Sequence, residues 1–380
     1  MTATTATTAT TAETADVVVV GAGIVGAAVA EALANDGARV TIVDSGAAAL
    51  GATAVGMGHL VAMDDSPAQL ALTSYSLDLW KSLAPELPPS AEYDPAGTLW
   101  VAEDEMQLEG VEEKIRAYAG RGMPLQWLDG KRVVELEPNL RPGLAGGLLA
   151  PRDAILYPPG AARALIDRAL ARGAQLREHT EVRELRANEV TTTRGTLRAG
   201  VIVNAAGTSA ARLTPDLPIV PRKGHLVITD RVPGFCRHQI VEMGYLKSAH
   251  RMTAESAAFN VQPRATGQVL IGSSRELVGW DASVNRQLVA AMLSRAQWFM
   301  PALAKLQAIR IWTGFRPATR DKLPLIGRWE RTPGLWIAAG HEGLGITTSL
   351  GTAALLADLI AGRTPAIDPA PFAPGRRVAA

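Results

Sequence analysis

The clearest pattern in the chain is an apolar run, then a helical stretch of small and apolar residues, then a second apolar run. Val17–Val20 is continuous and apolar, which is typical of a parallel strand buried on both faces. The helical stretch extends to Asn35, and Val40–Val43 follows, ending at Asp44. This order predicts a strand, a helix and a second, parallel strand.

Three glycines join the first strand to the helix in the spacing Gly21-Ala-Gly23-Ile-Val-Gly26. Gly21 permits a tight turn, Gly23 lets the backbone approach a pyrophosphate, and Gly26 lets the helix pack close to the strand. The helix N-terminus offers free N–H groups to phosphates, and Asp44 can bind ribose hydroxyls. The spacing therefore predicts a dinucleotide site, with a glycine turn in another kind of βαβ unit as the alternative.

The remaining pattern alternates between helical and strand periodicity. We expect helices over 68–83, 104–120, 159–172, 285–298 and 347–361. We expect strands over 97–101, 174–176, 182–185, 190–193, 195–198, 201–207, 225–228, 257–261, 269–271 and 335–340. The nucleotide-binding elements are thus interleaved with segments of a second domain.

Composition narrows the functional classes. The 380 residues carry a net charge of +1, which gives no electrostatic basis for binding nucleic acid. Cys236 is the single cysteine, so an intrachain disulfide is excluded, and the six histidines lack metal-site spacing. We therefore expect no metal.

The first fifteen residues are rich in Thr and Ala and lack the basic and apolar regions of a signal peptide. We expect a disordered tail there. The apolar stretch 15–34 contains Asp16, Glu31 and the three glycines, so we interpret it as strand plus helix and expect no transmembrane segment. The expected location is cytoplasmic, with peripheral contact at the inner face of the membrane as an alternative.

Two C-terminal segments carry a family resemblance. They are Trp312-Thr-Gly-Phe-Arg316-Pro, continuing to Gly327, and Gly340-His-Glu-Gly-Leu-Gly-Ile-Thr347. With the N-terminal glycines, they resemble the FAD-dependent amine oxidoreductases of the D-amino-acid oxidase type, especially the D-amino-acid and hydroxy-D-proline dehydrogenase branch. The resemblance covers nearly the whole chain.

The resemblance implies an α/β fold, with a Rossmann-like FAD-binding domain and an interleaved α+β substrate domain built on an antiparallel sheet. The expected FAD-binding domain comprises residues 16–87, 146–220 and 312–364. The expected substrate domain comprises 88–145 and 221–311, between tails at 1–15 and 365–380.

The resemblance also implies roles for particular residues. Arg316 would hold the substrate carboxylate, because a guanidinium grips a carboxylate with two parallel bonds; a structural ion pair with Asp321 is the alternative. Tyr245 and His341 are further catalytic candidates, although a structural hydrogen bond within its turn is the favoured interpretation of His341. The implied cofactor contacts, besides Gly21, Gly23, Gly26 and Asp44, are Thr53, Met57, Gly58, Val182, Gly207, Gly343, Gly345 and Ile346.

Other polar residues are candidates for the substrate pocket. They are Lys247, His250 and Gln262, and His59 would face either the active site or the residues behind it. Cys236 lies outside the segment where sarcosine oxidases attach flavin, so FAD is expected to be bound non-covalently.

Two departures from glycine oxidases guide the substrate prediction. Where those enzymes carry arginine and asparagine, this chain has Gly343 and Leu344. The loop 57–60 and the turn 343–346 resemble those of enzymes of bacterial hydroxyproline breakdown. Together with the departures, this resemblance implies hydride transfer to flavin N5 from a D-amino acid such as cis-4-hydroxy-D-proline or D-proline, with a quinone or partner protein as electron acceptor. The alternatives are a broad D-amino-acid dehydrogenase, a glycine- or sarcosine-type oxidase, a flavin subunit inactive alone, and an NAD-dependent dehydrogenase.

Overall fold

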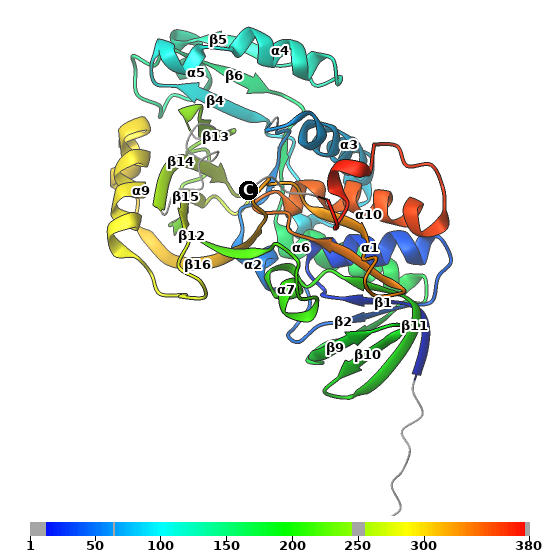
Figure 1. The fold of residues 1–380 in the computed structure, drawn as a ribbon. Helices are drawn as coiled ribbons and strands as arrows, with labels where there is room; N and C mark the ends of the chain where they lie inside the picture. Colours follow the sequence, from blue (N-terminus) through cyan, green and yellow to red (C-terminus); the bar gives the residue numbers. More distant parts are fainter. Residues whose placement is uncertain (1–12, 64, 245–254, 377–380) are drawn as a thin grey trace, which may run out of the picture.

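The computed structural model describes residues 13–63, 65–244 and 255–376. Two eight-stranded sheets form its framework, one at the lower right and one at the left of Figure 1. Three pocket candidates from the sequence, Tyr245, Lys247 and His250, lie outside the described residues.

The first sheet is mostly parallel and has the order β17-β18-β11-β1-β2-β8. Its parallel strands are β1 (Glu13–Val20), β2 (Val40–Val43), β8 (Gln175–Arg177), β11 (Gly195–Asn204) and β18 (Leu335–Ala339). Antiparallel additions are β17 (Leu325–Arg328), which pairs with β18, and the meander of β9 (Val182–Arg186) and β10 (Glu189–Thr192), which pairs with β11.

Both faces of this sheet are covered, which explains its continuous apolar strands. Val17 and Val19 belong to the core beneath the helices, whereas Val18 and Val20 belong to the core on the opposite face. The covering helices are α1 (Ile24–Asn35), α6 (Pro158–Ala171) and α10 (Gly345–Ala361), with α3 (Pro67–Leu83) packed on α10. Helix α1 ends where the sequence predicts, because Gly37 adopts a φ of +89° just beyond it.

The second sheet is antiparallel except for one parallel pair, β13 with β4. Its order is β16-β12-β15-β14-β13-β4-β6-β5. The strands are β4 (Thr98–Ala102), β5 (Gln126–Asp129), β6 (Gly146–Ala150), β12 (Val220–Thr229), β13 (Gln239–Glu242), β14 (Glu255–Pro263), β15 (Val269–Glu276) and β16 (Ala308–Ala318). Helix α9 (Arg286–Phe299) packs on β14 and β15, where Phe299 stacks on Phe259 with ring centroids 4.5 Å apart.

Smaller elements lie between the strands along the chain. They are α2 (Ala52–Val55), α4 (Val111–Ala119), α5 (Gly130–Leu136), α7 (Ala210–Leu213) and the two-stranded pair of β3 (His59–Leu60) with β7 (Ala154–Ile155). The predicted fold class, a Rossmann-like domain with an interleaved antiparallel sheet, is confirmed. None of the helices in the described ranges is long and apolar enough to cross a membrane.

The structure differs from the expected domain division at three places. Glu13–Ala15 belong to β1 instead of a tail, because the long strand β11 supplies partners as far as Leu197. Strand β6 lies in the second sheet beside β4, whereas the expected division places residues 146–150 in the FAD-binding domain. Strand β16 crosses the expected boundary at 312 and pairs with β12 along its length. Local apolar patterns do not reveal which sheet a strand joins, since pairing is a long-range choice.

Two element boundaries also differ from expectation. The single helix expected over 104–120 is a short 3₁₀ turn, Glu105–Leu108, followed by α4. Gly110 has a φ of +80° between them, which interrupts the helical backbone. The two strands expected over 195–198 and 201–207 are one strand, β11.

Candidate active site

A cavity of ≈ 430 Å³ opens where the strand order of the first sheet reverses, at the carboxyl ends of β1 and β11. Its floor includes Gly21, Ala205 and Gly207, and the second sheet supplies the facing wall. Open α/β sheets bind ligands at this switch point. The volume lies within the range of about 300–1,000 Å³ that small-molecule sites occupy.

The glycine loop has the close packing that its spacing predicts. Gly21 has a φ of +109°, and a Cβ there would lie 2.5 Å from the carbonyl oxygen of Ala205. A Cβ on Gly26 would lie 1.9 Å from the carbonyl oxygen of Gly21. Helix α1 therefore begins against the strand, with Gly23 on the cavity wall. The backbone here fits a pyrophosphate, which needs close approach and free N–H groups.

Asp44 is fixed at the edge of the same cavity. Its Oδ2 accepts a hydrogen bond from Ala22 N at 2.7 Å, and its Oδ1 accepts one from Gly46 N at 2.8 Å. An ionised carboxylate has further lone pairs on each oxygen, so both can still accept from hydroxyl groups. This arrangement fits a ribose.

The segment after β2 forms another side of the cavity. Thr53 lines it, and its Oγ1 accepts a hydrogen bond from Ile24 N at 3.0 Å, which ties this segment to the start of α1. Met57 also lines it, whereas Gly58 lies behind the wall, where a Cβ would be 1.6 Å from the carbonyl oxygen of Leu156. Gln262 accepts a hydrogen bond from Gly58 N at 2.9 Å. Gln262 thus holds the loop and does not line the main cavity.

Helix α10 directs its N-terminus at the cavity. Gly343, Gly345 and Ile346 line the cavity at that end of the helix. Backbone N–H groups and the positive end of the helix dipole favour negative charge there. This environment fits the N1–O2 edge of a flavin, which becomes negative on reduction.

His341 is buried beside this turn. Its Nε2 lies 3.0 Å from Thr352 Oγ1, and burial lowers the pKa of His341 to about 3. The ring is therefore neutral near pH 7. His59 also lines the cavity, and burial lowers its pKa to about 3; its Nε2 is buried without a hydrogen-bond partner among the described residues.

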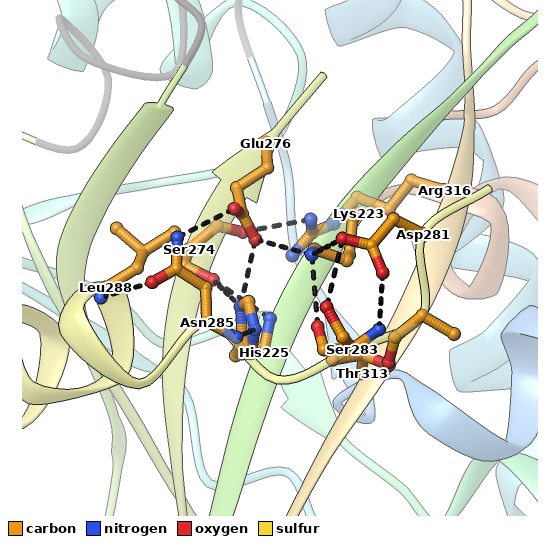
Figure 2. A network of polar contacts seen from close by, with 11 residues as sticks. Lys223, His225, Ser274, Glu276, Asp281, Ser283, Asn285, Leu288, Thr313 and Arg316 are labelled. Atoms are coloured by element: carbon orange, nitrogen blue, oxygen red, sulfur yellow. Dashed lines mark hydrogen bonds and ion pairs between the residues drawn. The ribbon is translucent and has the colours of Figure 1, made fainter. Parts of the chain in front are cut away.

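Arg316 extends from β16 into the opposite side of the cavity. Its guanidinium lies over Gly224, where a Cβ would be 2.3 Å from Nη1, and Nη1 donates to the carbonyl oxygen of Ser274 at 3.1 Å. Figure 2 shows Arg316 beside the polar network of Lys223, His225 and Glu276 on the second sheet. The alternative ion pair with Asp321 is wrong, because Asp321 forms two bonds with Arg376, at 2.7 and 2.9 Å.

A charged cluster adjoins Arg316. Glu342 Oε1 lies 3.3 Å from Arg222 Nη1 and 3.7 Å from Arg275 Nε, and Glu342 Oε2 accepts from Gly343 N at 2.6 Å. Burial works to raise the pKa of Glu342, but Arg275, Arg316 and Arg222 outweigh burial and hold it below its usual value. The carboxylate is therefore ionised, and this end of the cavity is rich in positive charge.

The structure brings most of the expected site residues around this one cavity. Those on its wall are Gly21, Gly23, Asp44, Thr53, Met57, Val182, Gly207, Arg316, His341, Gly343, Gly345 and Ile346. Gly26 and Gly58 stand behind the wall as packing positions. Within the described ranges, no group of three or more His, Cys, Asp or Glu side chains could hold a metal.

The sequence interpretation missed several wall residues on the second sheet. They are Gly224, Leu226, Asn260 and Ser273; Glu342, in the turn before α10, is a further wall residue that it missed. Alternation along β14 was the available signal for Asn260, since it shares a face with Gln262. Gly224 and Ser273 had no local signal.

Comparison with known proteins agrees with this geometry. The family described as "FAD dependent oxidoreductase" matches residues 16–359. The chain is 32% identical to a glycine oxidase of Geobacillus kaustophilus over 379 residues, covering 96% of this chain and 97% of that protein. It is 31% identical to a glycine oxidase of Pseudomonas aeruginosa, covering 95% of this chain and 99% of that protein.

Solved structures show the same fold. The crystal structure of the Geobacillus kaustophilus glycine oxidase superimposes with a TM-score of 0.87 at 30% identity, over 97% of this chain and all of that one (100%). An L-proline dehydrogenase from P. horikoshii also gives a TM-score of 0.87, at 24% identity, over 96% of this chain and 97% of that one. The glycine loop, the α10 turn and the sequence match together show that this chain belongs to the family of FAD-dependent oxidoreductases that act on amino compounds.

Proposed function

We propose that the protein oxidises the Cα–N bond of a D-amino acid larger than glycine, and that a cyclic secondary amine such as cis-4-hydroxy-D-proline or D-proline is its substrate. The observation that carries this proposal is the guanidinium of Arg316 on the cavity wall beside Gly343. Arg316 would bind and orient the carboxylate. When bound, FAD supplies the acceptor for the hydride that leaves Cα.

Position 343 is a glycine, and its lack of a side chain supports a substrate larger than the amino acid glycine. A Cβ on Gly343 would lie 3.6 Å from Cδ and from Nε of Arg316, so any longer side chain would stand against the guanidinium. The arginine that glycine oxidases carry here would fill this space. The glycine leaves it open to the ring or side chain of a substrate.

The contribution of the chain under this proposal is mainly positioning. Arg316 holds the carboxylate in a fixed orientation, which converts binding energy into alignment of the reacting carbon. His341, neutral near pH 7, keeps its hydrogen bond to Thr352 and orders the turn that carries Gly343.

A glycine- or sarcosine-type oxidase is the second candidate function. Two relatives named glycine oxidase, at 31% and 32% identity over nearly the whole chain, favour it. An iminodiacetate oxidase structure at 26% identity with a TM-score of 0.80 adds a secondary-amine example.

Anaerobic bleaching of the flavin separates these candidates. Purified holoenzyme is mixed with glycine, sarcosine, D-alanine, L-proline, D-proline and cis-4-hydroxy-D-proline. The proposal expects the fastest bleaching with the D-proline compounds. Fast bleaching by glycine or sarcosine with none by D-proline would establish the second candidate instead. Turnover of the single chain with an artificial dye would exclude a flavin subunit that is inactive alone.

We further propose that a quinone or partner protein, rather than oxygen, reoxidises the enzyme. The dehydrogenase-like Gly-Leu-Gly-Ile turn at 343–346 supports this. Reoxidation of the reduced enzyme is compared in air-saturated buffer and with a soluble quinone analogue. Peroxide release at the rate of turnover would contradict the proposal.

A further inference from the structure

Two polar side chains on the cavity wall have no role in the site described above. The amide oxygen of Asn260 on β14 and the hydroxyl of Ser273 on β15 both belong to residues that line the cavity. Asn260 is 4% exposed and Ser273 is 3% exposed. Neither Asn260 Oδ1 nor Ser273 Oγ has a hydrogen-bond partner among the described residues.

Such orphaned groups are costly in a folded protein. A buried polar atom without a partner loses its hydration, so native structures leave few of them unpaired unless a ligand or water completes the bond. Two such atoms on the neighbouring strands β14 and β15 of one cavity wall therefore indicate that a polar group of a ligand binds there.

The pair lies beside the part of β15 that Arg316 contacts. The guanidinium of Arg316 leans over β12 at Gly224 and reaches β15 through the carbonyl oxygen of Ser274. Ser273 is the adjacent residue on β15, and Asn260 lies on the next strand, opposite Gly272. A carboxylate held by Arg316 would therefore leave the more distant part of the ligand near this pair. In an amino acid, a hydroxyl on the γ-carbon is farther from the carboxylate than the α-amine is.

The chemistry of the pair also suits a hydroxyl. An amide oxygen only accepts, while a serine hydroxyl both donates and accepts. A ligand hydroxyl that reached both residues would donate to Asn260 and accept from Ser273. Around the pair the wall is apolar, with Leu226 and Met57 beside Gly272, so the two polar atoms are the distinguishing feature of this corner.

We infer that Asn260 and Ser273 form a hydroxyl-binding subsite that selects amino acids carrying a hydroxyl on the γ-carbon. This inference rests on the proposed function in so far as Arg316 holds the carboxylate. It makes Asn260 and Ser273 specificity-determining residues and predicts a preference for the hydroxylated substrate over its parent.

Binding is measured without turnover by using two carboxylates that the enzyme does not oxidise. Butyrate and 4-hydroxybutyrate differ only by a γ-hydroxyl, and each is titrated into the oxidised holoenzyme while the flavin spectrum is followed. We expect 4-hydroxybutyrate to bind about tenfold more tightly than butyrate. Asn260→Leu and Ser273→Ala should each remove most of that difference and leave butyrate binding within about twofold, since neither touches the carboxylate grip.

Ser256→Ala is the matched control. Ser256 lies on β14, its hydroxyl is also buried, and it does not line the cavity. This variant loses the same hydroxyl as Ser273→Ala and should keep the full preference. FAD content and the circular dichroism spectrum are recorded for every variant, and Asn260→Ser is made as a smaller polar replacement that should restore part of the preference.

The same comparison is made in turnover, with cis-4-hydroxy-D-proline against D-proline. Equal binding of the two carboxylates by the wild type would overturn the inference. Equal losses for both carboxylates in the variants would also overturn it, because they would assign the pair to the carboxylate. A loss of FAD in the variants would assign the pair to the cofactor and overturn it too.

The outcome also separates this inference from the proposed function. If no D-amino acid bleaches the flavin but 4-hydroxybutyrate keeps an advantage that depends on Asn260, the reaction is wrong and the subsite stands. If D-proline is oxidised while the hydroxyl brings no advantage, the reaction stands and the subsite is wrong.

Discussion

The position of the Arg316 guanidinium depends on two neighbouring residues of the second sheet. Gly224 leaves room for the guanidinium, and the carbonyl oxygen of Ser274 accepts one of its N–H bonds. Arg316 thereby lies on the cavity wall. A rigid fork in a half-buried site binds a carboxylate more strongly and more directionally than a lysine would.

Replacement of Arg316 by alanine tests the carboxylate grip. We expect Arg316→Ala to weaken binding of a carboxylate ligand by about 2–5 kcal/mol, because a charged hydrogen-bonded partner is removed. The flavin spectrum should change little, and Arg316→Lys should recover only part of the affinity. Titration of butyrate into each holoenzyme measures the effect. Near-normal affinity in Arg316→Ala would mean that another cation holds the carboxylate.

His341 gives the protein a defined sensitivity to acid. Burial lowers the pKa of His341 from 6.5 to about 3 in the folded state, so the unfolded chain binds more protons between these values. Its contribution to the free energy of unfolding is complete above pH 6.5 and decreases as the pH falls towards 3. The decrease is up to about 1.4 kcal/mol per pH unit.

Denaturant unfolding at pH 7 and pH 5 measures this dependence. His341→Asn should remove the part of this dependence that His341 contributes and keep the part from His59, whose pKa burial also lowers to about 3. His179→Asn should leave the dependence as in the wild type. His179 is an exposed histidine with a φ of +50°, a conformation that asparagine tolerates. An unchanged slope in His341→Asn would contradict the assignment.

At the scale of elements, the cavity is made by the ends of two helices and the turns before them. Helix α1 begins directly after Gly23, and helix α10 begins at Gly345. Both glycines line the cavity, so both helix N-termini lie at its wall. Each end offers N–H groups that have no partner within the helix. The N-terminus of α1 fits the pyrophosphate of FAD, and the N-terminus of α10 fits the flavin ring, which becomes negative on reduction.

The packing of α1 against β1 depends on Gly26. We expect Gly26→Ala to lower the free energy of unfolding by about 1–3 kcal/mol or more and to reduce the FAD retained on purification, because the new Cβ would lie 1.9 Å from a backbone carbonyl. Gly200→Ala on β11 is the control, since its Cβ would meet nothing closer than 3.9 Å. Chemical unfolding and flavin absorbance measure both effects; equal behaviour of the two variants would refute the packing argument.

At the scale of the whole molecule, the cavity lies where the two sheets meet and is lined by segments from both ends of the chain. The wall combines Gly21 near the N-terminus, Arg316 on the second sheet and Gly345 near the C-terminus. Chain segments far apart in sequence must therefore fold together before the site exists. Bound FAD should raise the stability of the protein as a whole by mass action.

Intact FAD should dissociate from the chain when the protein is denatured. Cys236 belongs to the core of the second sheet and does not line the cavity, and burial raises the pKa of its thiol, which makes it a poor nucleophile. We expect yellow protein that releases free FAD in acid or denaturant. Filtration of the denatured sample, followed by absorbance of the filtrate, measures this; colour that stays with the chain would indicate a covalent link.

Local sequence was sufficient for the parts of the site whose chemistry is local. The βαβ unit that ends at Asp44, the glycine spacing from Gly21 to Gly26 and the helix behind Gly345 follow from periodicity, turn requirements and resemblance, because strand, turn and helix N-terminus are neighbours in the chain. The choice of sheet for β6 and β16 did not follow, because an apolar strand pairs equally well with several partners until the tertiary fold selects one.

The sequence by itself determined the fold class, the FAD-binding loop and the identity of Arg316 as the carboxylate candidate. Only the tertiary structure decided that Asp321 pairs with Arg376, which removes it as a partner for Arg316. The structure alone also placed Asn260 and Ser273 on the cavity wall. The physical reason is that burial without a partner is a property of the packed surroundings of an atom, and strand pairing between distant segments creates those surroundings.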